Sequence, residues 1–302
     1  MNVLITGGLG FVGRYLSRLL LEKGHHVTAL GLRPQPRLIP HPDFSYLSAD
    51  TTRPGAWQET LCDMDAVVNL AGKNIFRPWT ARAKAEIYDS RILTTRNVAA
   101  ALPQDRPTTL VSASAVGYYG DRGDEILTEA STAGDDFLAR VGRDWEAEAL
   151  AAAEGGHRVV AARIGIVLGS DGGALEKMIP AFRSFLGGPL GDGSQWFPWI
   201  HIDDLTAALA FVLENASVAG PVNCTAPNPV RNREFARELA RLLNRPALMP
   251  APGFMIRMVL GELGQALLSS QRVVPEKLLE AGFAFRFPTV REALYDLVRA
   301  VV

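Results

Sequence analysis

Short apolar runs alternate with helix-type patterns through the first half of the chain. Apolar residues fill these runs almost without interruption, which is typical of parallel strands covered by helices on both faces. Right-handed crossovers bring the carboxyl ends of such strands to one edge, where ligands bind. The pattern therefore predicts an α/β fold with a doubly wound parallel sheet of Rossmann type. The expected strands cover residues 3–6, 27–30, 44–47, 66–70, 110–113 and 159–164.

Helical periodicity appears between these runs and dominates the end of the chain. Val12, Leu16, Leu19 and Leu20 share one face of a helix that we expect to end at Gly24. Residues 80–102 and 135–154 also have helical patterns, and a short strand is expected near Val222. The later helices are expected at residues 203–214, 233–243, 254–268, 275–281 and 290–301.

Glycine-rich and proline-rich segments after Gly165 predict a domain border. Residues 169–173 and 187–193 carry the composition of loops rather than of regular structure. We therefore predict a nucleotide-binding Rossmann domain at residues 1–168, to which residues 197–220 return. Residues 169–196 and 221–302 are expected to form a smaller, mostly helical substrate lobe.

Composition narrows the class of partner. A formal net charge of -1 argues against a nucleic-acid partner, because phosphate binding leaves a basic footprint. We expect no membrane segment and no signal peptide, and therefore a cytoplasmic protein. Cys62 and Cys224 lie far apart in the sequence, and no His or Cys spacing suggests a metal site. Both cysteines are expected to be small core residues.

The turn after the first strand has the spacing of a dinucleotide site. In Thr6-Gly-Gly-Leu-Gly-Phe-Val-Gly13, the glycines at 7, 10 and 13 follow a strand directly and open a helix. Gly7 permits the tight turn, Gly10 lets backbone N–H groups approach a pyrophosphate, and Gly13 allows close helix packing. The helix start adds partial positive charge, so Phe11 and Val12 are also candidate cofactor contacts. An ordinary glycine-rich turn is the alternative.

The second strand bears on which dinucleotide is bound. NAD-specific sites usually end this strand with Asp or Glu, but residues 28–33 contain no carboxylate and end in Arg33. Arg33 can form a charge-assisted contact with a 2′-phosphate, which favours NADP(H) over NAD(H). A solvated loop arginine is the alternative, and Arg37 is a weaker candidate for the same role. Asp50 is placed to accept a hydrogen bond from an adenine amino group.

Several longer motifs carry a family resemblance. The chain resembles the extended short-chain dehydrogenase/reductases, and within them the YfcH-like, epimerase-annotated subfamily with its C-terminal domain of unknown function, here from about Arg231. The resemblance implies that Leu32 and Arg33 flank the adenosine ribose, and it allows a homodimer. The motifs are Asn69-Leu-Ala-Gly72, Asp89-Ser-Arg91, Ser112-Ala-Ser-Ala-Val-Gly-Tyr-Tyr-Gly120, Asp144-Trp-Glu146, Trp199-Ile-His-Ile-Asp-Asp204 and Thr225-Ala-Pro-Asn-Pro229.

The same resemblance implies further cofactor contacts along the strand ends. The small residues at 69–72 let the centre of the cofactor pass close to the fourth strand. Arg91 has a second interpretation as a helix-surface ion pair. The implied contacts are Leu70, Ala71, Gly72 and Ser112 at the strand ends, Glu86 and Arg91 on the long helix, and Val167 near the nicotinamide.

The superfamily transfers protons with a Tyr made acidic by a Lys four residues later, assisted by a Ser. Ser114 matches the serine, but the expected helix at 135–154 contains neither Tyr nor Lys. A phenol with a pKa near 10 is a poor base at neutral pH without a nearby cation. Tyr118 or Tyr119, with positive charge from Arg122 or Arg163, is the replacement we consider. Packing of the pocket wall is the other interpretation of these tyrosines.

The segment 187–201 combines a flexible loop with aromatic side chains, which suggests closure over a substrate. Gln195, Trp196, Trp199 and His201 are the candidate substrate residues. The tryptophans can equally anchor the second lobe, and His201 can be structural.

Three functions remain open from the sequence. The first is an NADP(H)-dependent oxidoreductase or epimerase-like enzyme acting on a small polar or carbonyl substrate. The second is a protein that senses NADPH without turnover, which the missing Tyr and Lys favour. The third is an NAD-dependent nucleotide-sugar epimerase.

Overall fold

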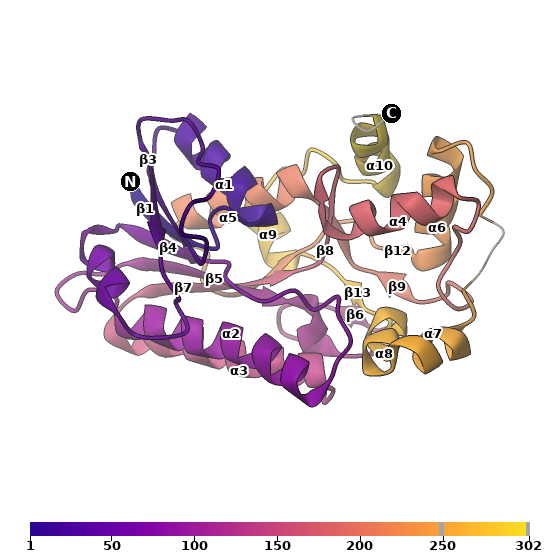
Figure 1. The fold of residues 1–302 in the computed structure, drawn as a ribbon, viewed down its shortest axis with the longest axis horizontal. Coiled ribbons are helices and arrows are strands. Elements are labelled where there is room, and N and C mark those ends of the chain that lie inside the picture. The colour runs from indigo at the N-terminus through magenta and orange to yellow at the C-terminus, as the bar shows by residue number, and fades with distance from the viewer. Residues whose placement is uncertain (248–250, 300–302) are drawn as a thin grey trace.

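Seven parallel strands form the main sheet of the protein (Figure 1). The structure, a computed structural model, describes residues 1–247 and 251–299. The strand order is β11-β7-β5-β4-β1-β2-β3, so the chain starts in the middle and winds outward in both directions. This order confirms the predicted Rossmann-type α/β fold. The strands are β1 (Asn2–Thr6), β2 (His26–Gly31), β3 (Phe44–Ser48), β4 (Ala66–Asn69), β5 (Thr109–Ala115), β7 (Arg158–Ile164) and β11 (Gly220–Cys224).

Helices cover both faces of this sheet, as its continuous apolar strands require. The helices α1 (Phe11–Glu22) and α5 (Ile202–Glu214) pack together on one face. The helices α2 (Ala81–Ala100) and α3 (Phe137–Leu150) pack together on the other face. Short 3-10 turns connect these layers: η1 (Ala56–Asp63), η2 (Val116–Tyr119) and η3 (Ala151–Gly155).

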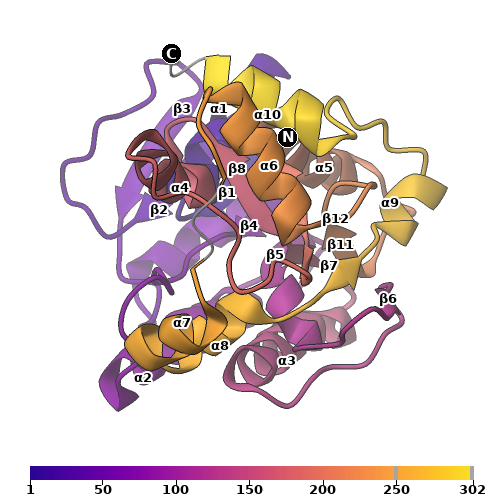
Figure 2. The same ribbon diagram turned by 90° about the vertical axis from the view of Figure 1, so that its right-hand side faces the viewer.

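A second lobe lies beyond the carboxyl edge of the sheet (Figures 1 and 2). It starts at β8 (Ile166–Gly169), which pairs in parallel with β10 (Trp199–His201). A separate buried cluster holds this lobe together and includes Phe182, Trp199 and Phe235. Its other elements are α4 (Gly173–Arg183), β9 (Trp196–Phe197), β12 (Val230–Arg231), α6 (Asn232–Leu242) and α10 (Val290–Arg299).

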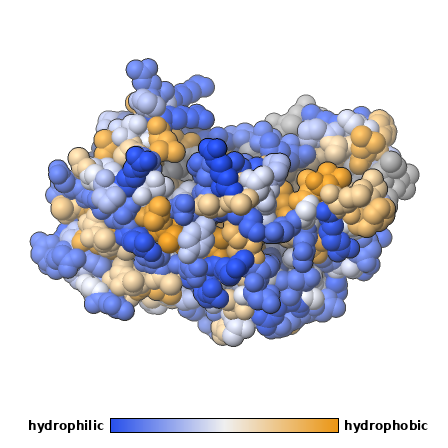
Figure 3. Space-filling model, turned by 60° about the horizontal axis from the view of Figure 1, so that its bottom comes forward, coloured by the Kyte–Doolittle hydropathy of each residue, from blue (hydrophilic) through white to orange (hydrophobic). Residues whose placement is uncertain are grey.

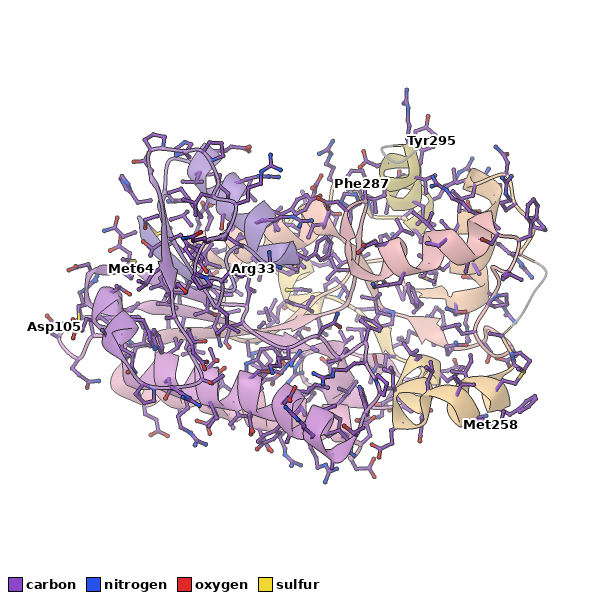
Figure 4. The ribbon with its side chains drawn as sticks, in the orientation of Figure 1. Arg33, Met64, Asp105, Met258, Phe287 and Tyr295 are labelled. Atoms are coloured by element: carbon purple, nitrogen blue, oxygen red, sulfur yellow. The ribbon has the colours of Figure 1, made fainter. Side chains whose placement is uncertain are left out.

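The remaining elements tie the second lobe to the first. The strand β13 (Arg272–Val273) pairs with β6 (Ile126–Leu127), and Lys84 of α2 forms an ion pair with Glu262 at 2.7 Å. Polar side chains dominate the face drawn in Figure 3. Met258, in the helix at Gly253–Leu260, is an exposed apolar side chain (Figure 4). These elements include α7 (Gly253–Leu260), α8 (Glu262–Leu268) and α9 (Glu276–Glu280).

Four details differ from the sequence-based expectations. The strand expected near Val222 is the seventh strand of the main sheet rather than part of the second lobe, since β11 pairs with β7. The single helix expected at 254–268 is two helices, because Gly261 has a φ of +57° and breaks it. The tract at 169–173 is not all loop, since β8 ends at Gly169 and α4 starts at Gly173. Cys62 is exposed, whereas Cys224 is buried as expected.

No helix among residues 1–247 and 251–299 is long and apolar enough to cross a membrane. The same residues contain no group of three or more His, Cys, Asp or Glu side chains that could hold a metal ion. The expected helix at 290–301 begins as predicted, and its last residues lie outside the described part of the chain.

Candidate functional site

A cavity of about 1300 Å³ opens at the carboxyl ends of β1, β2, β3 and β4. Many residues predicted as cofactor contacts line it, although they come from segments far apart in the sequence. The parallel sheet brings them together, because the carboxyl ends of its strands share one edge. The predicted residues on the cavity wall are Gly7, Gly10, Leu32, Arg33, Asp50, Ala71, Gly72 and Glu86.

The glycine-rich turn has no room for side chains. Gly7 has a φ of +69°, a conformation that favours glycine. A Cβ on Gly10 would lie 3.0 Å from the carbonyl oxygen of Gly7, and a Cβ on Gly13 would lie 2.2 Å from that oxygen. Gly10 is the N-cap of α1, and neither a side-chain cap nor an acidic residue occupies the first turn. The free N–H groups at this helix start can therefore donate hydrogen bonds to an anion.

Hydrogen bonds between side chains fix the strand ends beneath the turn. The Thr6 hydroxyl donates to Asn69 Oδ1 at 2.6 Å and accepts from the backbone N–H of Ala71 at 3.2 Å. Asn69 Nδ2 in turn donates to the hydroxyls of Thr95 and Ser112. Ser112 is 1% exposed, so the structure places it below the cavity rather than on its wall. The network therefore links the carboxyl ends of β1 and β4 to β5 through their side chains.

Positive charge gathers at the end of the cavity that β2 and β3 form. Arg18, Arg33 and Arg37 line the cavity, and within the described structure none of them has a carboxylate partner. Arg14, by contrast, is paired with Asp171 at 2.8 Å. Arg33 is the second residue after β2 and is labelled in Figure 4. Unpaired guanidinium groups of this kind favour a phosphate-bearing ligand.

Sequence reasoning did not find every residue of this wall. Arg18 and Arg53 also line the cavity. Arg18 lies on α1 five residues after Gly13. Whether its side chain reaches the cavity depends on how the helix crosses the sheet, which the sequence does not show. Arg53 follows Asp50, whose pKa is lowered by the hydroxyl of Thr52, by its N–H group and by Arg53. The only signal for Arg53 in the sequence was its position three residues after Asp50, the predicted adenine contact.

Of the two charged residues of α2 that we expected to face the pocket, Glu86 lies on the cavity wall and Arg91 lies behind it. Glu86 lines the cavity and contacts Lys73, Arg77 and Arg82, and the hydrogen bonds from these cations lower its pKa to about 2. Arg91 Nη1 donates to the carbonyl oxygens of Lys73 and Ile87 rather than to a carboxylate. Burial lowers its pKa to about 10.

Arg91 also lies against the backbone that follows β4. A Cβ on Gly72 would lie 3.1 Å from Arg91 Cζ. The structure therefore does not contain the helix-surface ion pair considered for Arg91. Its guanidinium instead backs the cavity wall at Gly72.

The predicted serine belongs to a buried polar cluster. Ser114 donates to Glu146 Oε1 at 2.6 Å, and Glu146 accepts two further hydrogen bonds from Arg163, each 2.8 Å long. Ser114, Glu146 and Arg163 are 2%, 5% and 2% exposed. Burial alone would lower the pKa of Arg163, but the bonds to Glu146 outweigh it and raise that pKa. The serine is thus held next to a fixed cation.

The structure separates the two candidate tyrosines. The Tyr119 hydroxyl lies 2.7 Å from Asn223 Oδ1, accepts from Arg163 Nη1 and is fully buried, and burial raises its pKa to about 12. Tyr118 is half-buried, and its ring lies 3.7 Å from Arg163 Cζ. Within the described residues, no protein group hydrogen-bonds to the Tyr118 hydroxyl. Only Tyr118 therefore keeps a free phenol beside a cation. Arg122, the other cation considered, is paired with Glu125.

The candidate substrate residues divide into two groups. Trp199 and His201 are each 1% exposed, and His201 caps α5 and stacks on Phe287 at 3.9 Å. These contacts are structural. Gln195 is also buried and donates to the carbonyl oxygen of Leu190.

Trp196 is half-buried between the two lobes. Its ring stacks with Arg231 and Arg272, and its indole N–H donates to Asp124. Of the four candidates it is the one with an accessible side chain.

Four predicted contacts lie around the cavity rather than on its wall. Leu70 and Val12 pack against the main core, and Val167 of β8 pairs with Ile200. Phe11 packs against the turn after β8, and its ring lies so close that a Cβ on Gly172 would be 2.3 Å from it. The glycine turn therefore contacts the start of the second lobe.

The sheet order, the glycine turn and the cavity at the switch in strand order define a Rossmann-type α/β protein. Two family models match the chain. The NAD dependent epimerase/dehydratase family matches residues 3–224, and a domain of unknown function (DUF1731) matches residues 251–297. The chain belongs to the NAD-dependent epimerase/dehydratase family.

Related proteins cover nearly the whole chain. The chloroplastic homolog of epimerase family protein SDR39U1 from Arabidopsis thaliana is 42% identical over 99% of this chain and 87% of its own. Epimerase family protein YfhF of Bacillus subtilis is 38% identical over 99% of this chain and 98% of its own. The crystal structure of human SDR39U1 (isoform2) with NADPH matches with a TM-score of 0.85 and 36% identity, covering 99% of both chains.

Proposed function

We propose that this chain binds NADP(H) and uses it in an oxidoreductase or epimerase-like reaction on a small polar or carbonyl substrate. The cavity wall is the observation that supports the proposal. On it lie a glycine turn without acidic residues and, after β2, the unpaired guanidinium of Arg33, where the strand ends without a carboxylate. The similarity to human SDR39U1, crystallised with NADPH, supports the same cofactor.

The residues present fit such a cofactor. The backbone at Gly7 and Gly10 would hold the pyrophosphate, since added side chains would fill this cradle. Arg33 would contact the 2′-phosphate, and Asp50 would accept from the adenine amino group. When bound, a nicotinamide supplies or accepts the hydride.

Tyr118 and Ser114 are the groups of this chain that would manage the proton. Arg163 lies on the face of the Tyr118 ring, so the proposed proton-transfer phenol has a fixed guanidinium beside it. Ser114 donates to Glu146, so it would have to rotate to polarise a substrate carbonyl. The phenol of Tyr119 supports the protein framework in this proposal.

Calorimetry with NADPH, NADP, NADH and NAD tests the cofactor assignment. Arg33→Ala should weaken NADPH binding at least tenfold and leave NADH binding unchanged, because a charge-assisted contact to phosphate is lost. Arg237→Ala is the matched control, since Arg237 is an exposed arginine of α6 away from the cavity. NADH binding as tight as NADPH binding in the unchanged protein would instead favour an NAD-dependent nucleotide-sugar epimerase.

A second function, sensing of NADPH without turnover, is favoured by one observation. The helix α3 offers neither Tyr nor Lys, and Ser114 is already hydrogen-bonded within the protein. A panel of carbonyl substrates followed by NADPH absorbance separates the two functions. Turnover that falls at least tenfold in Tyr118→Phe, with unchanged cofactor affinity, supports the enzyme. No turnover on a broad panel supports the sensor.

A further inference from the structure

We propose that Tyr46 is a positioning residue that holds Arg33 for the 2′-phosphate of the adenosine and so sets the preference for NADP(H). The inference rests on the proposed function, because it concerns how the same cavity selects its cofactor. Tyr46 lies on β3, where it pairs with Ala29 of the adjacent strand. It lines the cavity together with Arg33.

The contact between these residues is a hydrogen bond from the phenol to the main chain. The Tyr46 hydroxyl donates to the main-chain carbonyl oxygen of Arg33 at 2.7 Å, which is an ordinary O–H···O distance. The bond acts on the backbone of Arg33, so it leaves the guanidinium group free. The side chain of Arg33 therefore starts from a fixed point at the end of β2.

Gly31 makes this contact sterically feasible. A Cβ at Gly31 would lie 3.0 Å from the Tyr46 hydroxyl and 3.5 Å from the nearest carbon of its ring. Contacts as short as 3.0 Å require a shift of the neighbouring atom. Because Gly31 has no side chain, the phenol can cross the end of β2 and reach Arg33.

The segment that follows has few other restraints. Residues 32–40 contain Pro34, Pro36 and Pro40, which lack N–H donors. In the described structure, the bond from Tyr46 is the only hydrogen bond that a side chain makes to this segment. Fixing the segment before the ligand arrives lowers the ordering cost of binding through Arg33. The benefit applies to a cofactor that carries the 2′-phosphate and not to one that lacks it.

Calorimetry on Tyr46→Phe with NADPH and NADH tests the proposal. The variant should bind NADPH about two- to tenfold more weakly, the range expected for one lost hydrogen bond, with NADH affinity unchanged. Gly31→Ala should shift the ratio of the two affinities in the same direction by displacing the phenol. Tyr88→Phe is the control, because it removes a phenol hydroxyl bonded to Asp144 outside the cavity. This variant should leave both affinities unchanged.

A double variant separates positioning from a direct contact. If Tyr46 acts through Arg33, then Arg33→Ala combined with Tyr46→Phe should bind NADPH no more weakly than Arg33→Ala alone. Equal losses for NADPH and NADH in Tyr46→Phe, or additive losses in the double variant, would overturn the inference. If Arg33→Ala changes the ratio and Tyr46→Phe does not, only this inference fails. If Arg33→Ala itself has no effect, the cofactor assignment fails.

Discussion

Replacing Glu146 by Leu should destabilise the protein through the cation that it leaves behind. Glu146 accepts from Arg163 Nε and Nη2, and both side chains are at least 95% inaccessible to solvent, since their exposed fractions are 5% and 2%. Removing one partner of a buried ion pair leaves an uncompensated charge, which costs about 3–5 kcal/mol of the free energy of unfolding. The Ser114 hydroxyl also loses its acceptor, which adds about 1 kcal/mol.

Replacing both partners should cost less than the sum of the two single changes. In the double variant Glu146→Leu with Arg163→Met, no buried charge remains, so a coupling free energy of about 2–3 kcal/mol is expected. Arg163 also donates to the Tyr119 hydroxyl and to the Glu129 carbonyl oxygen, so the double variant remains less stable than the unchanged protein. These lost bonds set a residual cost of about 1–3 kcal/mol.

Urea denaturation of the four proteins measures these free energies. Tryptophan fluorescence and far-UV circular dichroism should be followed together, because coincident transitions justify a two-state treatment of this two-lobed chain. Ser131→Ala is a suitable control outside the cluster, since Ser131 makes only a local loop hydrogen bond. Single variants that each cost less than about 1 kcal/mol, or additive costs in the double variant, would refute the reasoning.

Three further outcomes are expected. Gly13→Ala should abolish pyridine-nucleotide binding measured by calorimetry, because its Cβ would lie 2.2 Å from the Gly7 carbonyl oxygen; retained binding contradicts this. Asp136→Ala should lower the free energy of unfolding by about 1 kcal/mol, since Asp136 caps α3, whereas Asp135→Ala should not. Burial raises the pKa of Glu129 in the folded state, so wild-type stability falls as pH rises from the unfolded pKa through the folded one. The free energy of unfolding in urea of Glu129→Gln, minus that of the wild type at the same pH, should therefore grow from pH 4 to pH 8. A difference that stays constant with pH contradicts the assignment.

The strands and the glycine turn were predictable because their signals are local. Continuous apolar runs identify buried parallel strands, and the glycines at 7, 10 and 13 have a fixed spacing after β1. The break at Gly261 was not predictable from periodicity, because apolar residues continue on both sides of it. The place of β11 at the sheet edge depends on pairing with β7, which is more than 50 residues earlier in the chain.

The candidate site was predictable in part. Arg33 and Asp50 lie on the cavity wall because the ends of parallel strands meet at one edge. The bond from Ser114 to Glu146 joins β5 to α3, and no spacing in the sequence indicates it. Trp199 and His201 looked like pocket residues because of their chemistry, but their strand pairs with β8 and buries them. Side-chain type alone does not reveal burial.

The turn after β8 has little mutational tolerance. A methyl group at Gly169 would lie 2.6 Å from the Phe11 ring, one at Gly172 would lie 2.3 Å from it, and Gly173 adds a φ of +75°. Ser170 and Asp171, between these glycines, already carry side chains, and that of Asp171 is held by Arg14 and Tyr15. Larger residues are therefore excluded at three of five consecutive positions. At Gly169 and Gly172 a smaller residue in place of Phe11 would have to come first, whereas at Gly173 the Val167 carbonyl oxygen, 2.5 Å from an added Cβ, excludes them as well.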